Sequence, residues 1–127
     1  LNPNLIIVYG GTKRKFLEGF SVASINEVDE RIAALPRGSK SRRVLERMFS
    51  GQALHTNIDE TGRLVLPQRI RDKVGIVSDA IFVASGDTFQ IWQPEFYSDH
   101  EAEIDLWYND QEVDFDPLIL LENESVE

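Results

Sequence analysis

The sequence predicts a β-rich α+β fold, and three observations support this prediction. Short, uninterrupted apolar runs recur along the chain and end at glycine, as buried strands that run into turns do. Apolar residues spaced three and four apart indicate helices between these runs. The length of 127 residues and the hydrophobic content of 42% are enough for one compact domain or two small fused units.

The first elements are expected to be two strands. Residues 4–9 (NLIIVY) form an apolar run that stops at Gly10 and Gly11. Residues 16–22 are expected to form the returning strand of a hairpin, with the basic cluster at residues 13–15 in its loop. These cations are candidates for phosphate contact, although loops also carry lysine for solubility.

Two helices are expected to follow. Ser24, with Glu27 three residues later, has the capping-box spacing and predicts a helix to about residue 35. Ser39 or Ser41 can cap a second helix, which Gly51 ends. The apolar residues of this second helix fall on one side: Val44, Leu45, Met48 and Phe49.

A third strand is predicted where apolar and polar residues alternate around residues 54–58. The chain then turns through Asp59–Gly62 and returns as Arg63–Leu66, with Leu64 and Leu66 on one face. Pro67 suits the first turn of a short helix, and Gly75 suits its C-terminal end. The segment from residue 57 to residue 67 (NIDETGRLVLP) therefore predicts a β-hairpin with a basic residue at its tip.

The last predicted elements repeat the first ones. Residues 80–84 (AIFVA) and 88–92 (TFQIW) are expected to form two strands around a glycine turn, followed by a helix from Pro94 to about residue 106. The order strand, glycine turn, strand, helix thus occurs twice, which indicates an internal duplication.

The hairpin tip holds the best candidate for a binding residue. Asp59 can accept hydrogen bonds from backbone amides ahead of it, and Gly62 can adopt the positive φ of a tight reversal. We assign these two residues to shaping the turn. The Arg63 guanidinium can fork onto a phosphate or onto guanine in the major groove. Alternatively, Arg63 pairs with Asp59 or Glu60 and stabilises the turn.

This hairpin, an Asp, two variable residues, Gly-Arg and a Leu-Pro exit, resembles that of the AbrB-like DNA-binding proteins. The internal duplication resembles the MraZ family within them, over most of residues 4–106. The resemblance implies double-split, swapped-hairpin β-barrel modules with connecting helices. It places the remainder of a first repeat in residues 1–50, a second repeat in residues 51–108 and an acidic tail in residues 109–127.

The family resemblance also implies a function. Members of the family bind double-stranded operator repeats as homo-oligomeric rings and regulate the gene cluster for division and cell-wall synthesis, as repressors or activators. Localisation in the cytoplasm at the nucleoid is expected. The sequence departs from the family in lacking a first Asp-x-x-Gly-Arg hairpin. If the family pattern holds, about one hairpin and helix ahead of Leu1 has been lost, cut away or left out of the sequence.

Other basic residues support or compete with Arg63. Arg69 and Arg71 lie on the short helix after the hairpin and are predicted to grip the DNA backbone, although a solvated helix face is an open alternative. Arg42, Arg43 and Arg47 are interpreted as surface charges or subunit contacts.

The charge distribution is polarised. The chain carries a net charge of −9, yet nine Lys or Arg stand against four acids between Arg37 and Lys73. From Glu95 to the end there are twelve acids and no Lys or Arg. A protein of this kind can present one basic face to phosphate while its total charge is negative. Both charge runs can also be ordinary solvated surface.

Several function classes lack support. There is no cysteine, the two histidines lie far apart in sequence, and Gly-x-Ser-x-Gly and phosphate-loop spacings are missing. We expect no enzyme activity, catalytic residue, cofactor, metal site, small-molecule substrate or membrane contact. The alternating acids at 110–116 lack the glycine and glutamate of a calcium loop. The rival function is an antitoxin-type interaction module, whose acidic C-terminal segment wraps a protein partner.

Overall fold

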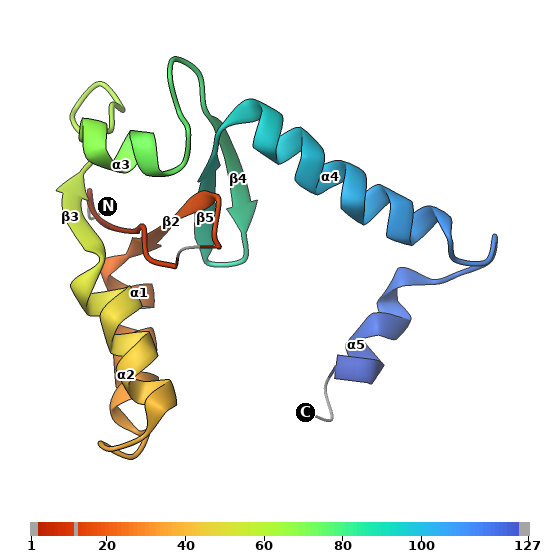
Figure 1. The fold of residues 1–127 in the computed structure, drawn as a ribbon, viewed down its shortest axis with the longest axis horizontal. Coiled ribbons are helices and arrows are strands. Elements are labelled where there is room, and N and C mark those ends of the chain that lie inside the picture. The colour runs from red at the N-terminus through yellow and green to blue at the C-terminus, as the bar shows by residue number, and fades with distance from the viewer. Residues whose placement is uncertain (1–2, 12, 125–127) are drawn as a thin grey trace. The chain divides into compact units, whose positions relative to one another are not determined.

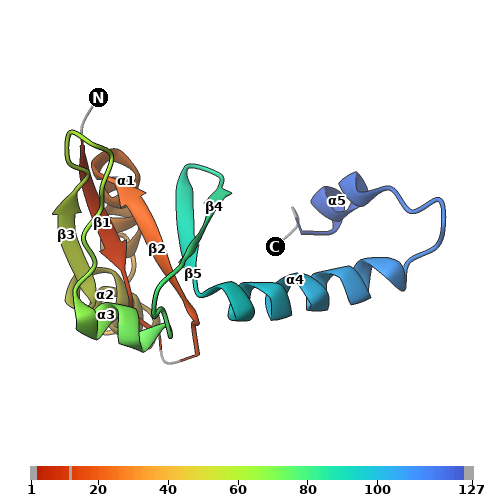
Figure 2. The same ribbon diagram turned by 90° about the horizontal axis from the view of Figure 1, so that it is seen from above.

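A five-stranded antiparallel sheet, in the order β3-β1-β2-β5-β4, forms the centre of the first compact unit of the chain (Figures 1 and 2). The computed structural model describes residues 3–11 and 13–124. The mixed α+β class predicted from the sequence is confirmed. The strands are β1 (Asn4–Val8), β2 (Phe16–Ser21), β3 (Ala53–Asn57), β4 (Ile81–Ser85) and β5 (Thr88–Trp92). The helices are α1 (Val22–Ala33), α2 (Lys40–Glu46), the π-helical turn η1 (Arg47–Gly51), α3 (Gln68–Lys73), α4 (Pro94–Asn109), the 3-10 turn η2 (Pro117–Ile119) and α5 (Leu120–Glu124).

The strands of both predicted repeats join this one sheet. β1 pairs with β2, and β4 pairs with β5, as two hairpins that meet along β2 and β5. β3 follows residue 50 in the chain but pairs with β1. The chain divides into compact units at residues 1–97 and 98–127. The boundary at residue 50 therefore marks no compact unit of its own, and the assignment of two repeats and a tail remains a prediction.

The first helix begins earlier than predicted. Ser21, not Ser24, is the N-cap of α1, and its hydroxyl oxygen accepts a hydrogen bond from the Ser24 amide at 3.0 Å. Ser24 is buried inside the helix. Ser21 is the N-cap because β2 ends at this residue and α1 begins at the next one, with no loop between them. The predicted strand 16–22 is correspondingly one residue shorter.

The second helix is capped by Ser39, one of the two predicted candidates, whose side chain accepts from the Arg42 amide at 3.2 Å. Arg42 also donates to the Leu35 carbonyl at 2.9 Å and lies 3.4 Å from the Glu46 carboxylate. It thereby ties α2 to the end of α1, and the two helices run side by side (Figures 1 and 2). Val44 is 48% exposed, so the predicted apolar side of this helix is only partly buried.

The sheet has a different cover on each face. On one face, α3 supplies Ile70 and Val74, which pack with Ile7, Leu17 and Ile91 of the strands. On the other face, Ile25 of α1 and Phe49 of η1 pack against strand residues, among them Ile6, Val8 and Phe20. The alternation of β1, with Ile7 facing α3 and its two neighbours facing α1, explains why this strand has a continuous apolar sequence.

The two hairpins are related by an approximate two-fold repeat. Leu17 pairs with Ile91 and Gly19 with Phe89, on either side of the Glu18–Gln90 pair. After each hairpin a polar side chain caps the next helix. Ser21 caps α1, and the Gln93 side-chain oxygen accepts from the Phe96 amide at 2.7 Å. The order strand, strand, helix thus occurs as β1–β2–α1 and again as β4–β5–α4, and its origin in a duplication remains a prediction.

The repeat is covered unequally. Ile7 of β1 has no exposed surface, because β3 and α3 lie beside and over it. Phe82, at the matching position of β4, is 60% exposed and stacks only on Phe89, with ring centroids 6.0 Å apart. β4 pairs with β5 alone among the strands of the described ranges. One edge of the sheet is thus open where the other edge carries β3.

The second compact unit, residues 98–127, contains most of α4, with η2 and α5. Phe115 packs edge-on against Trp107 and Tyr108, at centroid distances of 5.9 and 5.8 Å. The sequence predicted an acidic tail here without motifs, and neither the aromatic cluster nor the two short helices were anticipated. No helix in the described part of the chain is long and apolar enough to cross a membrane.

Candidate nucleic-acid interface

A single carboxylate organises the turn that precedes Arg63. One oxygen of Asp59 accepts hydrogen bonds from the Thr61 amide at 2.9 Å, the Thr61 hydroxyl at 2.8 Å and the Arg63 amide at 2.8 Å. These bonds favour the ionised carboxylate, so the Arg63 amide first and the Thr61 hydroxyl next hold the pKa of Asp59 below its usual value. The predicted role of Asp59 in shaping the turn agrees with this geometry.

Gly62 completes the reversal. Its φ is +81°, in the left-handed region, and its amide donates to the Asp59 carbonyl at 3.0 Å. No atom lies within 4 Å of the position that a Cβ would take. Glycine is therefore required here by backbone conformation, not by space.

The prediction of a two-stranded ribbon over residues 57–67 is wrong, because the paired part is much shorter. Beyond β3 the only pairing across the turn is the bridge between Ile58 and Leu64, and residues 65–67 form no strand. Residues 64–66 separate from the strand before the turn because Leu64 and Leu66 pack against the core that Ile70 of α3 also joins. Val65 between them is 74% exposed. Burial of two leucines outweighs the extra ladder bonds, and Pro67 has no N–H with which to continue a ladder.

The Arg63 side chain projects from this turn into solvent. Its residue is exposed, and its guanidinium makes no hydrogen bond, ion pair or ring contact with any described residue. The alternative in which Arg63 pairs with Asp59 or Glu60 is therefore not the arrangement found. The Asp59 carboxylate instead accepts a hydrogen bond from the backbone amide of Arg63. The backbone of Arg63 is fixed and its charge is left available.

The other two predicted contact residues are placed differently from Arg63. Arg69 lies over the Tyr9 ring, with 5.6 Å between the guanidinium carbon and the ring centroid, and donates to the Tyr9 hydroxyl at 3.3 Å. Arg71 is half-buried and donates to the Gln68 side chain at 2.8 Å, while its Nε is buried without a partner. Arg69 thus remains at the surface, and Arg71 is partly committed to α3 itself.

Sequence reasoning missed Lys73 and Tyr9 as residues that position this region. The Lys73 ammonium donates to the backbone carbonyls of Tyr9 and Gly11, which ties the end of α3 to the loop between β1 and β2. Partial burial, and then the nearby Arg14 cation, lower the pKa of Lys73. No local spacing links residues more than sixty positions apart, so the sequence carried no signal for this contact.

The basic cluster at residues 13–15 is largely engaged within the fold. Arg14 forms an ion pair with Glu18 at 2.7 Å and lies over the Phe16 ring at 4.6 Å. The Lys15 ammonium lies 4.6 Å from the centroid of the Phe96 ring. These contacts favour the interpretation that this loop supports the fold over the interpretation that it contacts phosphate.

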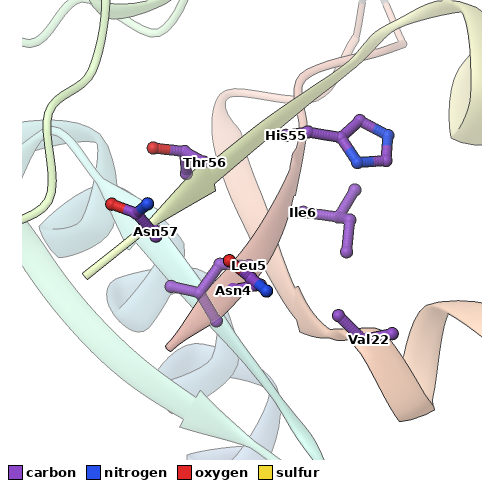
Figure 3. Close-up of a pocket in the computed structure, with 7 residues that line it drawn as sticks. All are labelled: Asn4, Leu5, Ile6, Val22, His55, Thr56 and Asn57. Atoms are coloured by element: carbon purple, nitrogen blue, oxygen red, sulfur yellow. The ribbon is translucent and has the colours of Figure 1, made fainter. Parts of the chain in front are cut away.

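A pocket of about 340 Å³ lies at the start of β1, near the end of β3 and the start of α1. In Figure 3, His55, Ile6 and Val22 point to one side of the sheet, and Thr56 points to the other. No residue that lines the pocket carries a permanent charge, so it offers no cation for phosphate. No group of three His, Asp or Glu side chains suited to a metal ion occurs in the residues that the structure describes.

Comparison with known proteins identifies the family. Residues 48–114 match the family described as "MraZ protein, putative antitoxin-like". A protein of Ruegeria sp. (strain TM1040) named Transcriptional regulator MraZ is 54% identical over 121 residues, which cover 94% of this chain and 72% of that protein. Its namesake from Ruegeria pomeroyi is 51% identical over 122 residues, covering 95% of this chain and 73% of that protein.

A more distant protein of the same name, from Cereibacter sphaeroides (strain ATCC 17025 / ATH 2.4.3), is 38% identical over 102 residues. These names describe regulators of transcription and not enzymes. The family match includes the Asp59–Arg63 turn and α3, and the two Ruegeria alignments cover 94% and 95% of this chain. This chain belongs to the MraZ family.

Proposed function

We propose that this protein is a regulator of transcription that binds double-stranded DNA through the turn carrying Arg63. The observation that carries the proposal is the exposed Arg63 guanidinium, unpaired within the described residues, on a turn that Asp59 fixes with three hydrogen bonds. A cation held out in this way can meet DNA phosphate or the acceptors of guanine without first giving up a protein partner. The names of the Ruegeria relatives support the same function.

Arg69 is the proposed second contact. Its guanidinium stays exposed while the Tyr9 ring limits its freedom, so it can bond a phosphate at a low entropic cost. Arg71, half-buried and bonded to Gln68, contributes to the local positive potential more than to direct contact. The shortened ribbon means that the turn itself, and not a long two-stranded arm, enters the groove.

A single turn with two cations gives weak binding, because affinity for duplex DNA grows with the number of phosphates that the protein neutralises. We therefore propose that several copies act together as a homo-oligomeric ring on repeated operator boxes, since linked sites raise apparent affinity. The promoter of the division and cell-wall gene cluster is the proposed target, and the nucleoid is the proposed location.

The open edge of β4 supports the proposal that the sheet is part of a swapped-hairpin barrel. β3 and α3 cover Ile7, whereas the matching Phe82 is 60% exposed on β4, which pairs only with β5 among the described strands. We propose that a hairpin-and-helix module equivalent to residues 53–75 covers this edge and completes the barrel. An open sheet edge favours such pairing because its backbone groups lack partners.

The test is the binding of a fluorescent duplex from the proposed promoter, with a scrambled duplex of the same composition as reference. Arg63→Ala is expected to weaken promoter binding roughly 5- to 150-fold, since a good bidentate contact to a base is worth roughly 1–3 kcal/mol. Arg31→Ala, an exposed arginine on α1, is the matched control and should bind as wild type. Wild-type affinity in the Arg63→Ala protein would contradict the proposal.

A second candidate function is an interaction module that holds a basic protein partner. It is favoured by the compact unit of residues 98–127, which carries acids and no Lys or Arg. The two candidates differ in their salt dependence. Binding to DNA weakens steeply as salt rises, whereas a clamp built on apolar anchors weakens much less.

A further inference from the structure

Two exposed helical faces of this chain have complementary chemistry. The first is the outer face of α2 and η1, made of Lys40, Arg43, Val44 and Arg47. The inner face of the same helix carries Arg42, Leu45 and Phe49, which are half-buried; Arg42 bonds to carbonyl groups at the end of α1, and Phe49 packs in the core. The outer face is therefore the side turned to solvent.

The outer face is basic with an apolar centre. Lys40, Arg43 and Arg47 are exposed, and their charged groups make no hydrogen bond or ion pair within the described ranges. Val44 lies among them and is 48% exposed. The Glu46 carboxylate does not neutralise this face, because it pairs with Arg42.

The second face lies on α4 and is made of Glu101, which is half-buried, and the exposed Ile104, Asp105 and Tyr108. These residues have the same spacing of three, four and seven as Lys40, Arg43, Val44 and Arg47, so each set forms one side of two helical turns. Ile104 is 50% exposed and Tyr108 is 47% exposed. Phe115 packs against the Tyr108 ring and fixes it.

We infer that the acidic α4 face of one copy packs on the basic α2 face of a second copy. Ile104 and Tyr108 would cover Val44, the two carboxylates would face Arg43 and Arg47, and an arginine can stack on the Tyr108 ring. Two different surfaces meet, so the contact is head-to-tail and generates a ring when the rotation closes. The inference rests on the self-association that we propose above.

The two faces are small compared with a standard interface, which buries roughly 800 Å² on each partner. One such contact is therefore weak and sensitive to salt. A closed ring repeats it at every subunit, so that the copies hold one another together. Charge complementarity selects the partner face and excludes contacts between two α4 faces or two α2 faces.

The test is charge reversal with rescue, followed by sedimentation velocity at low and moderate salt. The double variants Arg43→Glu/Arg47→Glu and Glu101→Arg/Asp105→Arg are each expected to associate roughly tenfold more weakly than wild type, because like charges then face each other. In an equal mixture both contacts between unlike variants are complementary, because the native acidic α4 face meets the native basic α2 face and the reversed basic α4 face meets the reversed acidic α2 face. The mixture is therefore expected to regain association as alternating copies. This rescue also shows that both variants are folded.

Matched controls reverse charges elsewhere. Arg31→Glu/Arg37→Glu changes exposed basic residues outside the α2 face, and Asp99→Arg/Glu103→Arg changes the opposite side of α4. Both controls are expected to sediment as wild type. The proposed interface would be overturned if either the α2 or the α4 variant assembled at wild-type strength, or if the mixture failed to assemble. Either result would leave the proposal of self-association intact. A monomeric wild type would overturn both, and neither result depends on the Arg63 binding measurement.

Discussion

The Asp59 carboxylate accepts a hydrogen bond from the backbone amide of Arg63 at 2.8 Å, while the Arg63 guanidinium remains exposed. The acid therefore positions the arginine through its backbone and leaves the opposite charge of its side chain free. An ion pair between the two side chains would have hidden the cation from a ligand. This division of roles makes the turn a rigid support for a binding residue.

Asp59 should give the turn a pH dependence. Its pKa is lowered in the folded protein, so the stabilisation it provides is present above its unfolded value, near 3.8, and is lost as the pH falls through the lower folded value. Carboxyl NMR of the wild type should show Asp59 titrating with a pKa below its ordinary value. In Asp59→Asn, the Thr61 and Arg63 amide signals should shift and lose this titration. An Asp59 that titrates at an ordinary value would contradict the hydrogen-bonded turn.

Gly62→Ala should destabilise the turn, because a Cβ is strained at a φ of +81°. The cost of a left-handed conformation for alanine is roughly 1–2 kcal/mol. Gly38→Ala is the control, since a Cβ there meets no atom within 4 Å and Gly38 does not have a positive φ. Urea denaturation and duplex binding should both show the difference. Equal stability of the two variants would mean that the turn does not depend on the backbone conformation of Gly62.

Gly19→Ala should disturb the junction between the two hairpins. A Cβ at this position would lie 2.2 Å from the Phe89 ring, so the ring must move. Overpacking of this kind costs about 1–3 kcal/mol. The double variant Gly19→Ala/Phe89→Ala removes the obstacle and should show a smaller loss than the sum of the two single changes. Additive losses in urea denaturation would show that the ring does not limit the site.

The turn was predictable from sequence because its chemistry is local. Asp59 and Gly62 act within four residues of each other, and their side-chain and backbone preferences are specific. The two-hairpin repeat was also predictable, since the apolar runs and glycine turns recur in the same order. The family resemblance, stated from the same residues, is confirmed by the comparisons.

The longer-range features were not predictable. The ribbon was expected to continue past residue 64, but Leu64 and Leu66 are drawn into the core by α3, a tertiary effect that strand alternation cannot show. The contact between Lys73 and the loop after β1 joins segments distant in sequence. The pairing of β3 with β1 likewise depends on the whole sheet. The local sequence pattern therefore predicts which strands and helices form, whereas tertiary packing determines how long they are and which strands pair.

The most direct test of the central claim measures promoter binding against salt concentration for the wild type, Arg63→Ala and Arg31→Ala. Each phosphate contact contributes about 0.9 to the slope of log affinity against log salt. The Arg63→Ala protein should lose affinity, with a slope reduced by about one if Arg63 contacts phosphate, or an unchanged slope and relaxed sequence preference if it reads a base. Affinity, slope and sequence preference identical to those of the wild type and Arg31→Ala would contradict the assignment of Arg63 as the DNA-binding residue.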